Sequence, residues 1–133
     1  MTTRNVEIMD LIVTKMAQGK TLSEALREVY TKRNVALPYH EEWLERKVTS
    51  LKMSLRTTQA LLRNKMQTIG DIVRYTKDHK ITSLQTFGKL SATELFEALL
   101  DYWWNHMSQA EKDSFLIDTV ERNSDNIRTT IEF

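Results

Sequence analysis

Three helix-start signals of the same kind recur along the chain and constrain its fold more than any other feature. Each is a capping box, in which Glu follows a Ser or Thr by three residues: Thr21 with Glu24, Ser91 with Glu94, and Ser108 with Glu111. Ser54 and Thr68 are two further candidate N-cap residues. All of these precede apolar residues at helical spacing, and the chain has only three Gly and one Pro. The sequence therefore predicts an all-α fold.

These signals predict seven helices. The first carries the apolar residues from Val6 to Met16 and ends at Gly19, and the second runs from the Thr21 cap toward Asn34. A third begins at Pro38 and continues to Leu51. Two short helices are expected at about 55–65 and 69–76, a long one after Ser91 and the last after Ser108, with a frayed tail beyond Asn123.

Charge is distributed unevenly along the chain, although the net charge is only +1. Residues 46–90 hold ten Lys or Arg and two acidic residues, a net charge of +8. Residues 1–45 carry a net charge of −1, and residues 91–133 carry −6. A basic block of this size is typical of a phosphate-binding surface. The alternative is that the basic block pairs with the acidic C-terminal block of the same molecule.

Several classes of protein are disfavoured by composition. The chain has no Cys, its three His residues are scattered, and no Ser lies in a recognisable nucleophile motif. We therefore expect no enzyme, no metal site and no cofactor. The sequence also lacks an apolar run of membrane-spanning length and a signal-peptide core, so we expect a cytoplasmic protein of bacterial or phage type without membrane contact.

Two separated motifs point to a known family. The first motif is "SLRTTQALL" at 54–62, followed in register by "TIGDIV" at 68–73. The second motif is "TFGKLSATELFEAL" at 86–99. Residues 54 to about 100 resemble the C-terminal domain of the bacterial RNA polymerase alpha subunit, a helix–hairpin–helix variant. The resemblance implies a compact all-α unit that binds DNA, flanked here by extra N- and C-terminal helices.

The resemblance also implies a set of DNA-binding positions. The family places an Arg in the minor groove of A-tract DNA at the position of Arg56, and an Asn at the position of Gln59. The turn and the next helix start supply positions near the DNA backbone. The full candidate set is Arg56, Gln59, Arg63, Lys65, Thr86, Gly88, Lys89, Ser91 and Glu94. One position departs from the family, since Leu90 replaces the second Lys of its turn.

These observations divide the chain into three parts. We expect a helical lobe for packing or partner binding at 1–50, the DNA-binding unit at 51–107, and a last helix with an acidic tail at 108–133. The predicted function is binding of AT-rich duplex DNA in transcription control. A non-enzymatic module that engages RNA polymerase, a sigma factor or an activator remains the alternative, favoured by Leu90 and the acidic C-terminal block.

Overall fold

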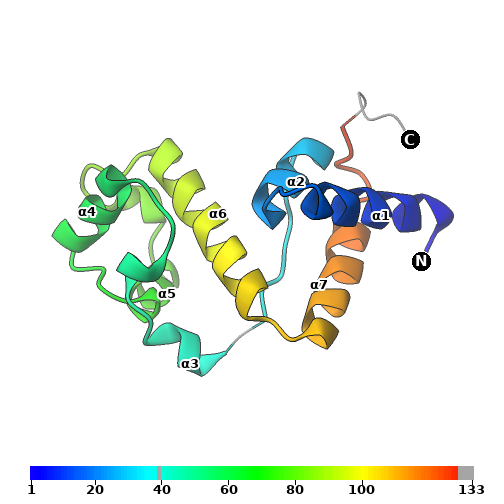
Figure 1. Ribbon diagram of the computed structural model, residues 1–133. Helices are drawn as coiled ribbons and strands as arrows, with labels where there is room; N and C mark the ends of the chain where they lie inside the picture. Colours follow the sequence, from blue (N-terminus) through cyan, green and yellow to red (C-terminus); the bar gives the residue numbers. More distant parts are fainter. Residues whose placement is uncertain (39, 129–133) are drawn as a thin grey trace. The chain divides into compact units, whose positions relative to one another are not determined.

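The computed structural model describes residues 1–38 and 40–128. Within these ranges the chain is helical, as predicted, and its extended segments pair only at two isolated bridges, Tyr30 with Ile127 and Lys47 with Thr68. The α-helices, labelled in Figure 1, are α1 (Thr3–Ala17), α2 (Leu22–Val29), α3 (Glu41–Leu44), α4 (Leu55–Arg63), α5 (Ile69–Thr76), α6 (Lys89–His106) and α7 (Gln109–Arg122). Two single 3-10 turns, η1 (Val48–Ser50) and η2 (Ile81–Ser83), complete the described elements. None of the described helices combines the length and the apolar character needed to cross a membrane.

The chain folds into two compact units. The terminal unit comprises Met1–Pro38 and the segment from Trp103 onward, and the central unit comprises Tyr39–Tyr102. These units divide the chain at other places than the boundaries at 50 and 107 that we expected. Residues 46–48 pack onto the loop before α5, where Val48 N–H donates to the Gln67 carbonyl and Ile69 N–H to the Arg46 carbonyl, both at 2.9 Å. This segment therefore joins the central unit.

In the terminal unit, α1 packs against both α2 and α7. The predicted helix signals hold here. Gly19 follows α1 with φ +102°, a left-handed conformation that favours glycine. The capping boxes of Thr21 and Ser108 both form, with each hydroxyl accepting a backbone N–H and each Glu carboxylate accepting one in return. The core between the helices is apolar and includes Ile8, Ile12, Leu26, Val29, Phe115, Leu116 and Val120.

Two expectations for the terminal unit were wrong. The second helix ends at Val29, five residues before Asn34, because the chain turns extended at Tyr30 and pairs with the segment after α7. Thr31 N–H donates to the Asn126 carbonyl at 2.8 Å and Arg128 N–H to the Val29 carbonyl at 3.0 Å. The segment from Asn123 to Arg128 is thus held by hydrogen bonds and is not frayed, while residues 129–133 lie outside the described part of the protein.

The central unit contains α3, α4, α5 and most of α6. Ser54 and Thr68 cap α4 and α5 as predicted, and Asp71 completes a capping box with Thr68. The expected third helix from Pro38 to Leu51 was wrong. It is broken into α3 and η1, because the residues between them extend to pair Lys47 with Thr68. Gly70 packs directly on α3, where a Cβ added to it would lie 2.9 Å from the Leu44 carbonyl oxygen.

Candidate nucleic-acid interface

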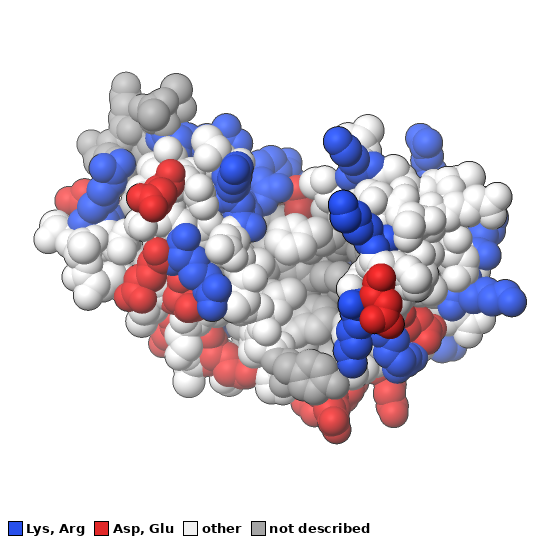
Figure 2. All heavy atoms as spheres, turned by 180° about the vertical axis from the view of Figure 1, so that it is seen from behind, with Lys and Arg blue, Asp and Glu red and all other residues white. Residues whose placement is uncertain are grey.

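The central unit carries a smaller net positive charge than the basic block that it contains. The central unit gains acidic residues from 39–45 and 91–102, so that it holds ten Lys or Arg and eight Asp or Glu, a net charge of +2. Figure 2 shows this unit on the right, with Lys and Arg projecting over its upper and right-hand parts and with Asp and Glu most numerous toward the bottom of the view. The positive charge is therefore local to part of the surface.

Helix α4 presents a basic stripe to solvent. Its buried side is formed by Thr57, Ala60 and Leu61. The spacing of three and four residues between Arg56, Gln59 and Arg63 puts these side chains on one exposed face. Lys65 follows the helix with φ +61° and is also exposed. Across residues 1–38 and 40–128, none of Arg56, Arg63, Lys65 and Lys89 forms an ion pair. No described carboxylate of the central unit therefore lies within ion-pair distance of the four cations.

The turn before α6 lies against the end of α4. The Asn64 side-chain amide donates to the Gln85 carbonyl at 3.0 Å and accepts from the Gln85 N–H at 3.1 Å. The next residue, Thr86, is exposed and has φ +60°, which is unusual for a β-branched side chain. The turn therefore carries local backbone strain at one of the predicted DNA-binding positions.

Gly88 is a glycine that the fold itself does not require. Its φ lies outside the left-handed region, and a Cβ added to it would meet no atom within 4 Å. The sites of Gly19 and Gly70 differ, since the first needs its positive φ and the second its close contact with Leu44. A ligand could therefore approach the backbone of Gly88 closely from the side where other residues carry a Cβ.

The start of α6 corrects one prediction. The helix begins at Lys89, so Ser91 lies inside its first turn and does not cap it. The expected capping box of Ser91 with Glu94 was wrong, because both side chains turn to α4. The Thr57 hydroxyl donates to the Ser91 hydroxyl at 3.4 Å, and the Ser54 N–H donates to the Glu94 carboxylate. These contacts link the starts of α4 and α6.

The pKa of Glu94 reflects this linking role. Burial alone would raise the pKa, but the hydrogen bonds from the Ser54 N–H and from the hydroxyls of Ser54 and Thr57 outweigh burial and lower it. Glu94 is therefore a charged acceptor that holds the start of α4. A direct contact of this carboxylate with phosphate would be repulsive, and in the structure the carboxylate is bonded to the start of α4.

All nine predicted positions thus lie in the central unit, on α4, just after it, in the turn after Leu84 and in the first turns of α6. Asn64 and Ser54 were not among them, although they provide the hydrogen bonds that hold these segments together. Asn is a common residue at helix ends, and this preference was the sequence signal that could have singled out Asn64 at the end of α4. We call the set Arg56, Gln59, Arg63, Lys65, Thr86, Gly88, Lys89, Ser91 and Glu94 the α4–α6 surface.

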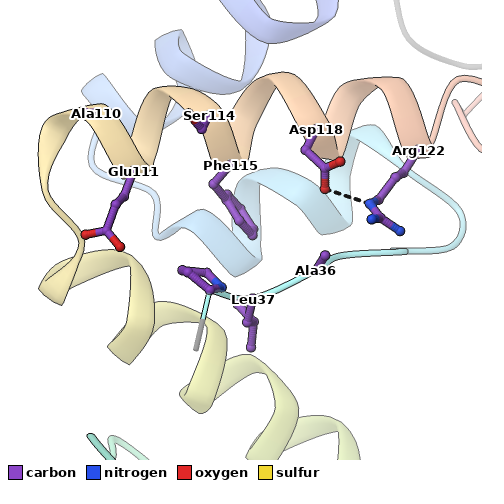
Figure 3. Close-up of a pocket in the computed structure, with 9 residues that line it drawn as sticks. Ala36, Leu37, Ala110, Glu111, Ser114, Phe115, Asp118 and Arg122 are labelled. Atoms are coloured by element: carbon purple, nitrogen blue, oxygen red, sulfur yellow. Dashed lines mark hydrogen bonds and ion pairs between the residues drawn. The ribbon is translucent and has the colours of Figure 1, made fainter. Parts of the chain in front are cut away.

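A shallow groove of about 500 Å³ lies in the terminal unit. It is formed by the extended residues 36–38 on one side and by α7 on the other, and Phe115 points from α7 toward the extended segment (Figure 3). The ion pair of Asp118 with Arg122, at 2.6 Å, lies at one end. Among the described residues, no group of three or more His, Asp or Glu could hold a metal ion. The groove presents no recognisable chemistry.

Comparison with known proteins connects the central unit to a family. Residues 38–101 match the model of the family described as the C-terminal domain of the alpha chain of bacterial RNA polymerase. No curated protein and no solved structure gives a significant match. The matched range contains the central unit except for its last residue, and it includes all nine positions of the α4–α6 surface. The central unit of this protein is therefore similar to the C-terminal domain of the bacterial polymerase alpha subunit, as its two sequence motifs predicted.

Proposed function

We propose that the protein binds duplex DNA through the α4–α6 surface and acts, without catalysis, in the control of transcription in a bacterial or phage-infected cytoplasm. The observation that supports this most is the stripe of exposed cations on α4, which have no acidic partner among the described residues, within a segment that matches a transcription family. Arg56 is the residue expected to enter the minor groove, because a planar, weakly hydrated guanidinium fits the narrow groove of A-tract DNA.

The remaining residues of the surface are proposed to hold the DNA backbone. Lys89, Arg63 and Lys65 supply positive charge, and the first turn of α6 has backbone N–H groups without partners in the helix. Gly88 lets a phosphate come close to these groups. In this arrangement Ser91 and Glu94 act indirectly, by fixing the start of α4 against that of α6.

A salt titration tests the proposal. Four to six phosphate contacts should give a log–log slope of affinity against salt of roughly −4 to −5 by counterion release. The measurement uses a fluorescent A-tract duplex and the intact protein, with a GC-rich duplex of equal length as the control for sequence preference. A slope near zero, or no binding at low salt, would contradict DNA binding by this surface.

The second candidate is a protein-interaction module that engages RNA polymerase, a sigma factor or an activator. Leu90 favours it, because this side chain is 89% exposed where the resembled family has a Lys. Binding to purified polymerase subunits in the absence of DNA, together with a flat salt titration on DNA, would support this candidate in place of the first.

A further inference from the structure

Two leucines are strongly exposed at the linked helix starts of the central unit. Leu90, the second residue of α6, is 89% exposed, and Leu55, the first residue of α4, is 71% exposed. These are the two highest exposures among the large apolar side chains that the structure describes. The helix starts that carry them are joined by the hydrogen bonds from Ser54 to Glu94 and from Thr57 to Ser91. Because Leu55 directly follows Ser54 and Leu90 directly precedes Ser91, both exposed side chains lie at the linked helix starts.

The neighbours of these leucines indicate which kind of partner fits. Arg56 follows Leu55 directly and Lys89 precedes Leu90, and neither cation has an ion-pair partner in the described residues. An apolar protein surface would desolvate both cations without compensation. A nucleic-acid groove offers phosphates for the cations and, between them, the apolar C–H faces of the sugars. The combination therefore favours a duplex over an apolar protein partner.

We propose that Leu90, together with Leu55, packs against the deoxyribose walls of the minor groove beside the site of Arg56. This inference rests on the proposed function and adds a contact that no phosphate interaction supplies. An apolar contact releases no counterions, so its share of the affinity is independent of salt. It also favours DNA over RNA, because the wide, shallow minor groove of duplex RNA displays polar 2′-hydroxyls at its walls.

With Leu at position 90 in place of the Lys of the resembled family, an apolar contribution to the free energy of binding replaces an electrostatic one. A lysine would add a phosphate contact that weakens with salt, and the leucine adds one that does not. The protein gains a part of its affinity that persists at high ionic strength, along with selectivity for DNA. The hydrogen bonds of Ser91 and Glu94 hold together the two helix starts that carry the leucines, so that both leucines can enter the same groove.

The experiment measures affinity for one A-tract duplex, as DNA and as RNA, over a salt series. The proteins are the parent, Leu90→Ala, Leu90→Lys and Ile117→Ala, the last being a control at an exposed aliphatic residue of the terminal unit. Leu90→Ala should lose about five- to tenfold in DNA affinity at every salt concentration with an unchanged slope, as expected for removal of a partly buried aliphatic group. Its affinity for the RNA duplex should not change, and Leu90→Lys should steepen the DNA slope by about 0.9.

Three outcomes decide the matter. If Leu90→Ala binds DNA within twofold of the parent at every salt concentration, the inference is overturned, because Leu90 then makes no contact with the duplex. If its loss disappears at high salt, the contact is electrostatic in origin and the inference is also overturned. If the parent itself fails to bind duplex DNA, the proposed function falls and the inference falls with it. Circular dichroism spectra that match the parent establish that the variants are folded.

Discussion

The side-chain amide of Asn64 forms two hydrogen bonds with the backbone of Gln85, donating to its carbonyl at 3.0 Å and accepting from its N–H at 3.1 Å. This pair fixes the end of α4 against the turn that precedes α6. On either side of it stand Lys65 and Thr86, the two non-glycine residues with positive φ in the part of the protein that the structure describes. Both belong to the α4–α6 surface, and Asn64 joins the two strained turns to each other.

Replacement of Thr86 by Asn should stabilise the protein. Asn tolerates a left-handed backbone better than a β-branched residue does. We expect Thr86→Asn to raise the free energy of unfolding by about 0.5–1 kcal/mol in urea titrations. Thr82→Asn, at an exposed site without positive φ, is the control and should give no gain. A less stable Thr86→Asn protein would mean that the turn is not strained at this residue.

Two glycine substitutions should separate folding from binding. Gly70→Ala should cost roughly 1–3 kcal/mol of stability, because the new methyl group would press on the Leu44 carbonyl at 2.9 Å. Gly88→Ala should leave stability unchanged or slightly higher, since its Cβ enters open space.

DNA binding should respond to the glycine substitution that leaves stability unchanged. Gly88→Ala should weaken DNA binding by blocking the close approach of a phosphate to the start of α6. Thermal unfolding and DNA titration of both variants check the prediction. Full DNA affinity in Gly88→Ala would remove this turn from the proposed interface.

We expect Tyr30→Phe to stabilise the protein, because this substitution removes a buried hydroxyl group. Tyr30 is fully buried, its hydroxyl has no hydrogen-bond partner in the described structure, and burial raises its pKa to about 12. Removal of an unsatisfied buried hydroxyl should raise the free energy of unfolding by about 1 kcal/mol. Tyr75→Phe is the matched control, because the Tyr75 hydroxyl is hydrogen-bonded to Ser83. If both variants lose stability, the Tyr30 hydroxyl has a partner after all.

Stability should fall in acid. Hydrogen bonds from Lys15 and Lys20 lower the pKa of Glu28 to about 2, and the pKa of Glu94 is also lowered. A carboxylate with a lowered folded-state pKa stabilises the protein fully above its unfolded-state pKa of about 4.3. This contribution is lost as the pH falls through the folded-state pKa.

We therefore expect the free energy of unfolding to be level from pH 7 to about 5 and to decrease between about pH 5 and pH 2. Glu28→Gln should have a shallower decrease over this range, because it lacks one of the groups that bind protons on unfolding. Urea titrations at each pH provide the measurement. Stability that increases on acidification would contradict these assignments.

Local signals in the sequence were sufficient for much of the fold. Ser54 and Thr68 begin α4 and α5 as predicted, because a cap depends on residues within one turn of it. The stripe of Arg56, Gln59 and Arg63 was likewise predictable from helical spacing, since the buried residues of α4 leave these three outward.

Contacts between distant residues account for what could not be predicted. The third helix breaks because Lys47 pairs with Thr68, twenty-one positions away. Glu94 satisfies every local rule for capping α6, yet its carboxylate accepts from Ser54 on another helix. The bond between Asn64 and Gln85 is equally absent from any local pattern. These long-range contacts set the geometry of the α4–α6 surface, while local patterns indicated its residues.

The most direct test of the proposed DNA binding is the affinity of Arg56→Ala for A-tract duplex DNA. Arg56 is exposed, so its removal should leave the free energy of unfolding within about 0.5 kcal/mol of the parent. The variant should lose about 1–3 kcal/mol of affinity and its preference for A-tract over GC-rich DNA, whereas Lys80→Ala should show a smaller loss that is equal on both. If Arg56→Ala binds A-tract DNA as tightly as the parent, the α4–α6 surface does not bind DNA and the protein-interaction hypothesis takes its place.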